Sequence, residues 1–287
     1  MKSVIHDKMS NAMFSVKKKN IIVTGAGGMI GSTISVSLAK AGVRLSILDC
    51  NAQKLKITGG KINGYGEGHL AFVCDVTDIE NLKKVNADIL KKIDRIDGLI
   101  NVAGGASKGA STRTEFLAPE TPLEDTFFGI NMTDFQYTSD LNFMGSVLPV
   151  KVFGEAMVRH QSGNIINISS MGAFRPLTKS PAYCAGKAAI TNFTLWLAAH
   201  LSKSNIRVNA IAPGFFLTEQ NRFLLYDEKS GDLTPRGKKI IEHTPLGKLG
   251  NPDDLISTVF WLLSDYSSFI TGAIIPVDGG FSAFTGI

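Results

Sequence analysis

The chain of 287 residues has few cysteines, no long apolar run and no low-complexity segment. Its three cysteines, Cys50, Cys74 and Cys184, are widely separated and odd in number, which favours reduced thiols over a disulfide framework. No apolar run approaches the ~18 residues of a membrane-spanning helix, and the first twenty residues lack the apolar core of a signal peptide. We therefore expect a cytoplasmic protein that has no membrane partner.

A basic stripe with interleaved aromatic residues, which would indicate a nucleic-acid binder, is also missing. The formal net charge is only +5, and part of it comes from Lys17, Lys18 and Lys19 near the N-terminus. The five histidines show no metal-ligand spacing, so we expect neither a nucleic-acid partner nor a metal site. Since no linker rich in Pro, Gly or Ser divides the chain, we predict a tail (1–17) followed by a single domain (18–287).

What the chain does contain is an alternation of short apolar runs with longer segments of crossover-helix length, such as 30–41 and 181–203. The short runs are continuously apolar and rich in β-branched residues, which is typical of parallel strands covered on both faces. We therefore predict an α/β fold with a doubly wound, parallel, seven-stranded sheet of the Rossmann-like type. The predicted strands are 20–25, 44–49, 70–75, 98–104, 164–170, 207–214 and 273–280.

Two segments, 106–140 and 215–250, do not fit this alternation. Both begin just beyond the carboxyl end of a predicted strand, which is where open α/β sheets bind their ligands. Long excursions at that edge are more often binding loops than accidents. We expect substrate loops there.

The first predicted strand runs into the glycine-rich stretch TGAGGMIG, Thr24 to Gly31. Glycines in a strand-to-helix turn let the backbone approach a pyrophosphate, whose charge is met by the helix N-terminus. Asp49 ends the second predicted strand, 24 residues after Gly25. A carboxylate at that place can accept hydrogen bonds from a ribose and repel a 2′-phosphate, so these residues predict a dinucleotide site that prefers NAD.

The stretch SPAYCAGK, Ser180 to Lys187, suggests a pair of catalytic groups. Ser180 is a good N-cap and Pro181 suits the first helical position, so Tyr183 and Lys187 would share one face of a helix. A cation beside the phenol would lower its pKa from a normal value of about 10. Taken by itself, the same pair could simply be solvated on an amphipathic helix.

Together these motifs resemble the short-chain dehydrogenase/reductase family. The resemblance rests on the glycine-rich turn, an NxAG element at Asn101–Gly104 and the YxxxK pair, and it extends over about residues 18–283. Asp75-Val76, Pro213-Gly214 with Thr218, and a VDGG element near the C-terminus also match. One position departs from the pattern, since Met29 stands where the family usually has its middle glycine.

The resemblance implies a set of catalytic residues. Tyr183 would pass a proton to a carbonyl oxygen as hydride arrives, Lys187 would support it and hold the nicotinamide ribose, and Ser170, 13 residues before Tyr183, would bond the substrate oxygen. Asn142 would assist Lys187. The implied NAD-binding residues are Gly25, Gly28, Met29, Ile30, Asp49, Asp75, Val76, Asn101, Ala103, Gly104, Tyr183, Lys187, Pro213, Gly214 and Thr218. Family members commonly assemble as tetramers, so a homo-oligomer is expected.

Within the family, three stretches resemble the fructuronate reductase type, also called D-mannonate oxidoreductase. They are SSMGAFRPLTKSPAYCAGK, APGFFLTEQNR and PVDGGFSAFTGI. A sugar acid needs a cation for its carboxylate and polar groups for its hydroxyls. Besides Ser170 and Tyr183, the candidate substrate-binding residues are Arg175, Gln220 and Arg222, with Lys108 a weaker one.

Other functions stay open on the sequence. One is reduction of another polyol or keto-sugar acid, as by a gluconate 5-dehydrogenase. A 3-oxoacyl carrier-protein reductase fits less well because it would want a basic patch and a slot for an acyl chain. A nucleotide-binding protein without turnover is disfavoured by the presence of Ser170, Tyr183 and Lys187.

Overall fold

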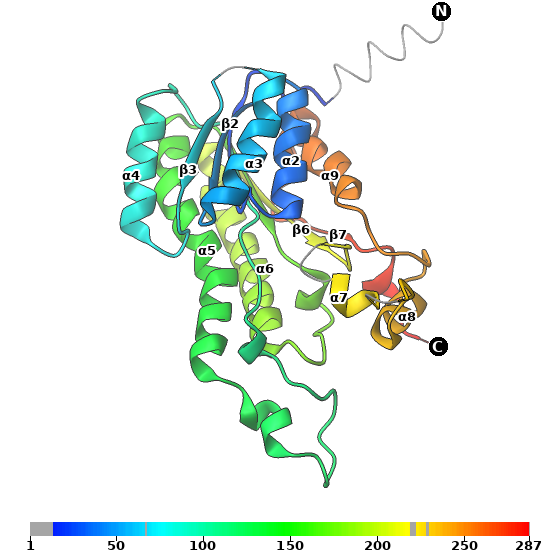
Figure 1. The fold of residues 1–287 in the computed structure, drawn as a ribbon. Helices are drawn as coiled ribbons and strands as arrows, with labels where there is room; N and C mark the ends of the chain where they lie inside the picture. The colour runs from blue at the N-terminus through cyan, green and yellow to red at the C-terminus, as the bar shows by residue number, and fades with distance from the viewer. Residues whose placement is uncertain (1–13, 67, 219–221, 228–229, 287) are drawn as a thin grey trace, which may run out of the picture.

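In the computed structural model, the described residues are 14–66, 68–218, 222–227 and 230–286. They form one seven-stranded sheet in the order β3-β2-β1-β4-β5-β6-β7, and every neighbouring pair of strands is parallel (Figure 1). All seven predicted strands are confirmed, with ends that differ by at most three residues. The strands are β1 (Asn20–Thr24), β2 (Arg44–Asp49), β3 (Leu70–Val73), β4 (Gly98–Asn101), β5 (Gly163–Ile168), β6 (Ile206–Pro213) and β7 (Ile274–Val277).

Helices cover both faces of the sheet, which makes the fold a three-layer, Rossmann-like one (Figure 1). One apolar core lies between the sheet and three helices: α2 (Met29–Lys40), α3 (Ala52–Ile62) and α9 (Ile256–Leu263). A second apolar core lies between the sheet and three others: α4 (Ile79–Leu90), α5 (Met132–Arg159) and α6 (Pro181–Leu201).

The two excursions lie at the carboxyl edge of the sheet, as predicted. The first is shorter than expected, because α5 begins at Met132, where Asn131 caps it by accepting hydrogen bonds from the amides of Thr133 and Asp134. The second carries two short helices, α7 (Arg222–Leu225) and α8 (Pro235–Glu242). Strand order reverses between β1 and β4, and the carboxyl edge at such a switch point is where doubly wound sheets bind ligands.

The predicted division into a tail (1–17) and one domain (18–287) stays a prediction. Val16, which the predicted tail includes, is buried in the core beside α2 and α9. In the part of the chain that the structure describes, no helix is both long and apolar enough to span a bilayer. The described structure leaves Cys50, Cys74 and Cys184 as free thiols.

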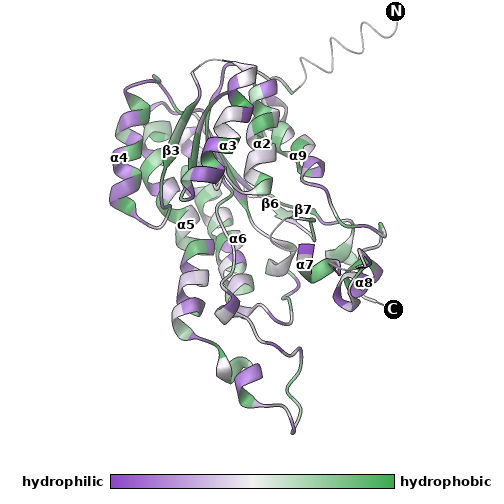
Figure 2. Cartoon of the chain, in the orientation of Figure 1, coloured by the Kyte–Doolittle hydropathy of each residue, from purple (hydrophilic) through white to green (hydrophobic). Residues whose placement is uncertain are grey.

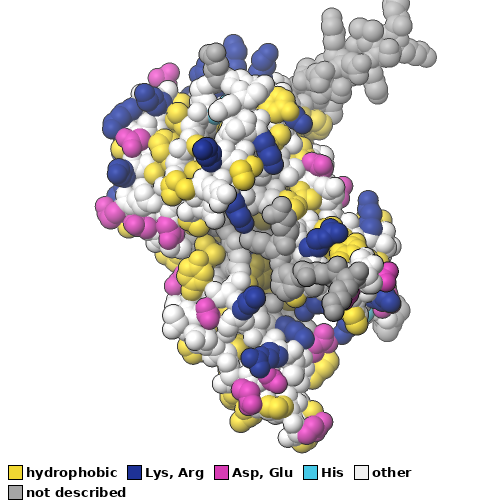
Figure 3. Space-filling view, viewed as in Figure 1, with side chains coloured by type: hydrophobic (Ala, Val, Ile, Leu, Met, Phe, Trp, Pro, Cys, Tyr) yellow, Lys and Arg dark blue, Asp and Glu magenta, His cyan; other side chains and the backbone are white. Residues whose placement is uncertain are grey.

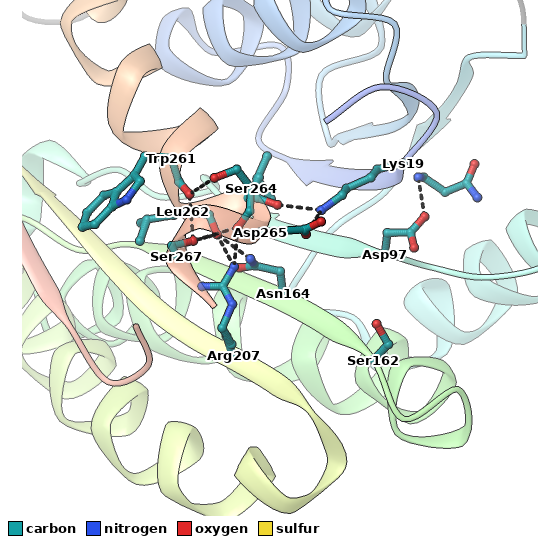
Figure 4. A network of polar contacts seen from close by, with 12 residues as sticks. Lys19, Asp97, Ser162, Asn164, Arg207, Trp261, Leu262, Ser264, Asp265 and Ser267 are labelled. Atoms are coloured by element: carbon teal, nitrogen blue, oxygen red, sulfur yellow. Dashed lines mark hydrogen bonds and ion pairs between the residues drawn. The ribbon is translucent and has the colours of Figure 1, made fainter. Parts of the chain in front are cut away.

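At the opposite edge of the sheet, a polar network attaches the end of α9 to the first residues of two strands (Figure 4). The Arg207 guanidinium donates to the carbonyls of Leu262, Ser264 and Ile270 at 2.5, 3.3 and 3.1 Å. Asn164 of β5 also donates to the Leu262 carbonyl. A cation at the carboxyl end of a helix is favoured by the helix dipole, so this contact fixes α9 in place.

Arg207→Met is therefore expected to destabilise the fold, with no direct effect on the residues at the carboxyl edge of the sheet. The substitution removes the charged donor from three carbonyls, which keep only their neutral donors from Asn164, Asn209 and Ser267, and a hydrogen bond from a charged group contributes roughly 1.5–3 kcal/mol. We expect the free energy of unfolding in urea to fall by about 3 kcal/mol. The exposed Lys203→Met serves as the matched loss of a cation and should change stability by less than about 0.5 kcal/mol. Equal stability of the two variants would contradict this account of the network.

Candidate active site

The glycine-rich turn after β1 forms a cradle lined by backbone. Gly25 has φ +62°, and a Cβ there would lie 2.6 Å from the amide nitrogen of Ala103. A Cβ on Gly31 would overlap the Gly25 carbonyl, so both positions require glycine. Gly28 is the N-cap of α2 and Met29 is its first residue. The unusual Met29 thus begins the helix, and the close approach comes from Gly25 and Gly31, whereas a Cβ at Gly28 would make only an ordinary contact.

Asp49, at the end of β2, points its carboxylate toward this turn. One oxygen accepts a hydrogen bond from the Gly27 amide and the other from the Asn51 amide, each at 2.8 Å. A Cβ at Gly27 would lie 2.9 Å from the Asp49 carboxyl carbon, so the turn and the carboxylate are closely packed. Two backbone donors therefore fix the orientation of an acceptor that suits ribose hydroxyls.

The turn after β4 lies directly beside the one after β1. The Thr24 hydroxyl accepts hydrogen bonds from the amides of Val102 and Ala103 at 3.1 and 3.3 Å. Asn101, whose role in cofactor binding stays a prediction, has a buried side chain that donates to the Asn167 side chain at 2.9 Å. This side chain joins β4 to β5 in the interior.

The remaining predicted cofactor residues lie at the ends of β3, α2 and β6. The Asp75 carboxylate accepts hydrogen bonds from the amide and hydroxyl of Thr77, and the neighbouring Val76 is buried. Ile30 packs on the core from the first turn of α2. Gly214, which follows Pro213, packs against the residue after β7, so that a Cβ on Gly214 would lie 2.6 Å from the Asp278 Cα. Thr218 follows on the loop after β6.

Ser170 and Tyr183 meet across the gap between β5 and α6. Ser170 follows β5, and its hydroxyl accepts a hydrogen bond from the Gly172 amide at 3.0 Å. Tyr183 is the third residue of α6, which begins at Pro181 as predicted, although the Ser180 side chain accepts no capping hydrogen bond. The Ser170 side chain lies close enough to the Tyr183 hydroxyl to lower its pKa. The structure thus brings together two groups that lie 13 residues apart in the sequence.

Lys187 lies one helical turn after Tyr183 and is buried. Its ammonium donates to the Ile168 carbonyl at 2.8 Å and lies 5.8 Å from the centre of the Tyr183 ring. The main-chain carbonyl of Lys187 accepts hydrogen bonds from the hydroxyls of Ser169 and Thr191. These two hydroxyls are hydrogen-bonded to each other at 2.6 Å. The end of β5 therefore holds the lysine at both its backbone and its tip.

Asn142, buried within α5, completes the group. Its amide donates to the carbonyls of Gly105 and Thr138 at 2.6 and 2.8 Å. A Cβ on Gly104 would lie 2.9 Å from the Asn142 side-chain oxygen and 3.2 Å from the Lys187 ammonium. Gly104 is thus a site residue for a reason that the motif alone does not reveal, because any side chain there would intrude between Asn142 and Lys187.

The protonation states differ from the sequence-based expectation. Burial raises the pKa of Tyr183, and the nearby Ser170 side chain opposes this rise only in part. Burial lowers the pKa of Lys187 from 10.5 to about 8. The net shift of the phenol pKa is therefore upward, opposite in direction to the lowering expected from a neighbouring cation. A phenol with a raised pKa stays protonated through neutral pH and is suited to give a proton away.

The candidate substrate-binding cations surround this edge without converging on one point. Arg175 is exposed, and its Nε donates to the Ser282 carbonyl near the C-terminus at 3.3 Å. Arg222 is exposed and lies 5.4 Å above the Tyr226 ring. Lys108 is exposed on the loop after β4. Gln220 lies outside the described residues.

The structure also shows contacts between loops that sequence reasoning missed. Lys239 of α8 forms an ion pair with Glu115 of the first excursion at 2.8 Å. Lys179, just before α6, donates to the Arg113 carbonyl at 2.7 Å. These contacts tie the loops after β4, β5 and β6 to one another. Their sequence separations of up to 124 residues and the lack of any local motif explain why they could not be predicted.

Comparison with known proteins agrees with this geometry. The family model described as Enoyl-(Acyl carrier protein) reductase matches residues 25–282. A protein of Haemophilus influenzae, described as an uncharacterized oxidoreductase, is 42% identical over 278 residues, which cover 96% of this chain and 97% of that protein. The uncharacterized oxidoreductase UxuB of Bacillus subtilis is 41% identical over 270 residues, which cover 94% of this chain and 96% of UxuB.

A solved structure supports the same comparison. It is a crystal structure, with bound NAD, of a candidate D-mannonate oxidoreductase from Haemophilus influenza. The two folds agree with a TM-score of 0.91 at 41% sequence identity, and the match covers 97% of this chain and 100% of the other.

Proposed function

The chain belongs to the short-chain dehydrogenase/reductase family and is an oxidoreductase, and from this we propose that it uses NADH to reduce the keto group of a sugar acid. The favoured reaction is the conversion of D-fructuronate to D-mannonate. The observation that carries the proposal is the grouping of Ser170, Tyr183, Lys187 and Asn142 beside a dinucleotide cradle. The solved relative described as a candidate D-mannonate oxidoreductase with NAD supports the substrate and the cofactor.

The cradle fits a dinucleotide on steric and chemical grounds. Gly25 and Gly31 let the turn pack tightly against neighbouring backbone, and the turn leads directly into the N-terminus of α2, which suits the charge of a pyrophosphate. The Asp49 carboxylate would hold the ribose hydroxyls and repel a 2′-phosphate. When bound, NADH supplies the hydride.

The residues around Tyr183 would handle the proton. Tyr183 keeps its proton at neutral pH because burial raises its pKa, and it would give that proton to the carbonyl oxygen as negative charge develops there. Ser170 lies beside Tyr183 and would bind the same substrate oxygen. Lys187 is placed by Ile168 and would hold its charge close to the reacting oxygen. In the reverse direction the tyrosine would act as the base.

The substrate class is tested by comparing two ketoses that differ in a carboxylate. D-Fructuronate and D-fructose share their keto group and hydroxyl stereochemistry, but only the former is an acid. We expect kcat/KM with NADH to be at least about tenfold higher for fructuronate, because a charge-assisted hydrogen bond contributes roughly 1.5–3 kcal/mol. A preference for fructose would contradict the sugar-acid assignment. A higher kcat/KM for 5-ketogluconate would favour the gluconate 5-dehydrogenase-like alternative.

Cofactor preference gives a second prediction. The wild-type enzyme should favour NADH over NADPH, because Asp49 would meet the 2′-phosphate with a like charge. Asp49→Ala should narrow the ratio of the two kcat/KM values by about tenfold or more. The control is Asp94→Ala, which removes an exposed carboxylate from the loop between α4 and β4 and should leave the ratio nearly unchanged. A wild-type preference for NADPH would contradict the role of Asp49.

The carboxylate clamp gives a third prediction. Arg175 and Arg222 are the arginines nearest in sequence to Ser170 and Thr218, and a planar guanidinium can meet both oxygens of a carboxylate. Replacing the true partner by Met should raise KM for fructuronate about tenfold to hundredfold and hardly change it for fructose. Cofactor affinity should be spared. If both single variants keep the wild-type KM, neither arginine is the clamp and Lys108 is next to be tested.

A further inference from the structure

The first excursion forms a structured arm that projects from the body of the protein. We define the arm as residues 111–131, between β4 and α5; it continues α5 beyond the sheet at the lower end of Figure 1. Its two sides are held together by hydrogen bonds from the amides of Arg113 and Thr114 to the Asp125 carbonyl at 2.9 and 3.2 Å. An ion pair between Arg113 and Asp125 at 2.9 Å adds to them. The arm is therefore an ordered element.

The arm nevertheless exposes a dense group of large apolar side chains. In Figure 2 the ribbon of the arm is coloured partly green and partly purple, so hydrophobic and hydrophilic residues are mixed along it. In Figure 3 apolar and acidic side chains lie at the lower end of the molecule. Its exposed apolar residues are Phe116 (77%), Leu117 (60%), Leu123 (59%), Phe127 (57%) and Phe128 (71%). The start of α5 extends the group with Met132 (63%) and Tyr137 (54%). Monomeric proteins rarely expose apolar patches of this kind unless the patch binds something.

The exposed area is close to what a stable interface needs. An aromatic side chain presents roughly 150–250 Å². At the exposures given above, the four aromatic residues alone offer on the order of 500 Å². A standard protein interface buries about 800 Å² on each partner, so the arm supplies more than half of one. Aromatic residues and methionine are also enriched at interface centres.

The charge of the arm indicates which partner it fits. The arm contains one basic residue, Arg113, and four acidic residues, namely Glu115, Glu120, Glu124 and Asp125. Since the whole chain carries +5 and the arm carries −3, the remainder carries +8. An acidic, apolar arm is poorly suited to nucleic acid or an anionic membrane, and it is complementary to the basic body of the same protein.

We propose that the arm docks on the basic body of a second copy of this chain. In a twofold symmetric pair each arm would reach the partner's body, so the two acidic arms need not face each other. The root of the arm is anchored to its own subunit, because Lys179 donates to the Arg113 carbonyl and Lys239 pairs with Glu115. Anchoring fixes the arm before it binds and lowers the entropy cost of docking.

Sedimentation equilibrium of the full chain tests this interface. Wild-type protein should form an assembly larger than the 30.8 kDa chain, and the double variant Phe116→Ser/Phe128→Ser should shift to smaller species, with a dissociation constant raised at least about 100-fold. The control is Phe269→Ser, at a fully exposed phenylalanine away from the arm, which should leave the assembly intact. A monomeric wild type, or equal assembly of the arm and control variants, would overturn the proposal.

Two further measurements guard against a folding artefact and test the charge argument. Reversing two exposed acids, Glu120→Lys/Glu124→Lys, should weaken assembly more than the neutral pair Glu120→Gln/Glu124→Gln does. A photo-crosslinking phenylalanine analogue at position 128 of the otherwise unaltered, purified protein should join two copies of the chain. Recovery of only uncrosslinked chains, or equal assembly of the Lys and Gln variants, would also overturn the proposal. None of these readouts depends on the substrate.

Discussion

Tyr183→Phe is expected to reduce kcat for fructuronate reduction by about 10²–10⁴-fold, the range typical of a lost general acid. The substitution removes only the hydroxyl beside Ser170 and keeps the ring at the start of α6. NADH affinity, measured by fluorescence titration, should change little, because the cradle at Gly25, Gly31 and Asp49 is untouched.

The control for this variant is Tyr266→Phe. Tyr266 is 65% exposed and contacts Phe14, in the region of α9 away from Ser170, so the loss of its hydroxyl should not affect turnover. In the wild type, oxidation of mannonate should accelerate as pH rises above neutral, because the raised pKa of Tyr183 keeps the required phenolate scarce. Near-normal turnover of Tyr183→Phe would remove this residue from the mechanism.

Lys187→Met is expected to have the second-largest effect, a loss of at least about 10²-fold in kcat/KM. The ammonium is the cation placed beside Tyr183, Gly104 and Asn142, and methionine removes its charge while filling similar space. NADH affinity should also fall if Lys187 holds the nicotinamide ribose as proposed. The steady-state rate and the NADH titration separate these two effects. Activity of the Met variant close to wild type would contradict the role of the lysine.

The same variant has a pH signature in stability that does not depend on substrate. Lys187 has a pKa of about 8 when folded, against 10.5 for an ordinary lysine, so between these values the unfolded chain binds more protons than the folded one. The wild-type free energy of unfolding should therefore rise with pH across this window, relative to that of Lys187→Met. The slope should be at most about 1.4 kcal/mol per pH unit. If the difference in free energy of unfolding between the two proteins did not change with pH, burial would not lower the pKa of Lys187.

Most of the fold could be predicted because local patterns express it. The seven apolar runs became seven parallel strands, and Pro181 marks the start of α6 as expected. Tyr183 and Lys187 could be paired because they lie one helical turn apart, and Ser170 was added to them by the family resemblance. The helix start at Met132 was not anticipated, since the capping by Asn131 lies inside a segment interpreted as a loop.

What could not be predicted depends on long-range packing. Burial decides the pKa values of Tyr183 and Lys187, and burial arises from how α5 and α6 pack on the sheet. Asn101 matches a cofactor motif, yet its side chain is used between β4 and β5. The ion pair between Glu115 and Lys239 joins loops whose meeting no motif encodes.

The most direct test of the central claim is to follow the hydride into the product. Enzyme, D-fructuronate and NADH carrying deuterium at the transferable position should yield D-mannonate that contains one deuterium atom, with one NADH consumed for each mannonate formed. Mass spectrometry of the sugar acid and NADH absorbance provide both numbers. The account predicts this product from wild-type enzyme and almost none from Tyr183→Phe. Recovery of unchanged fructuronate with no loss of NADH from the wild-type reaction would contradict it.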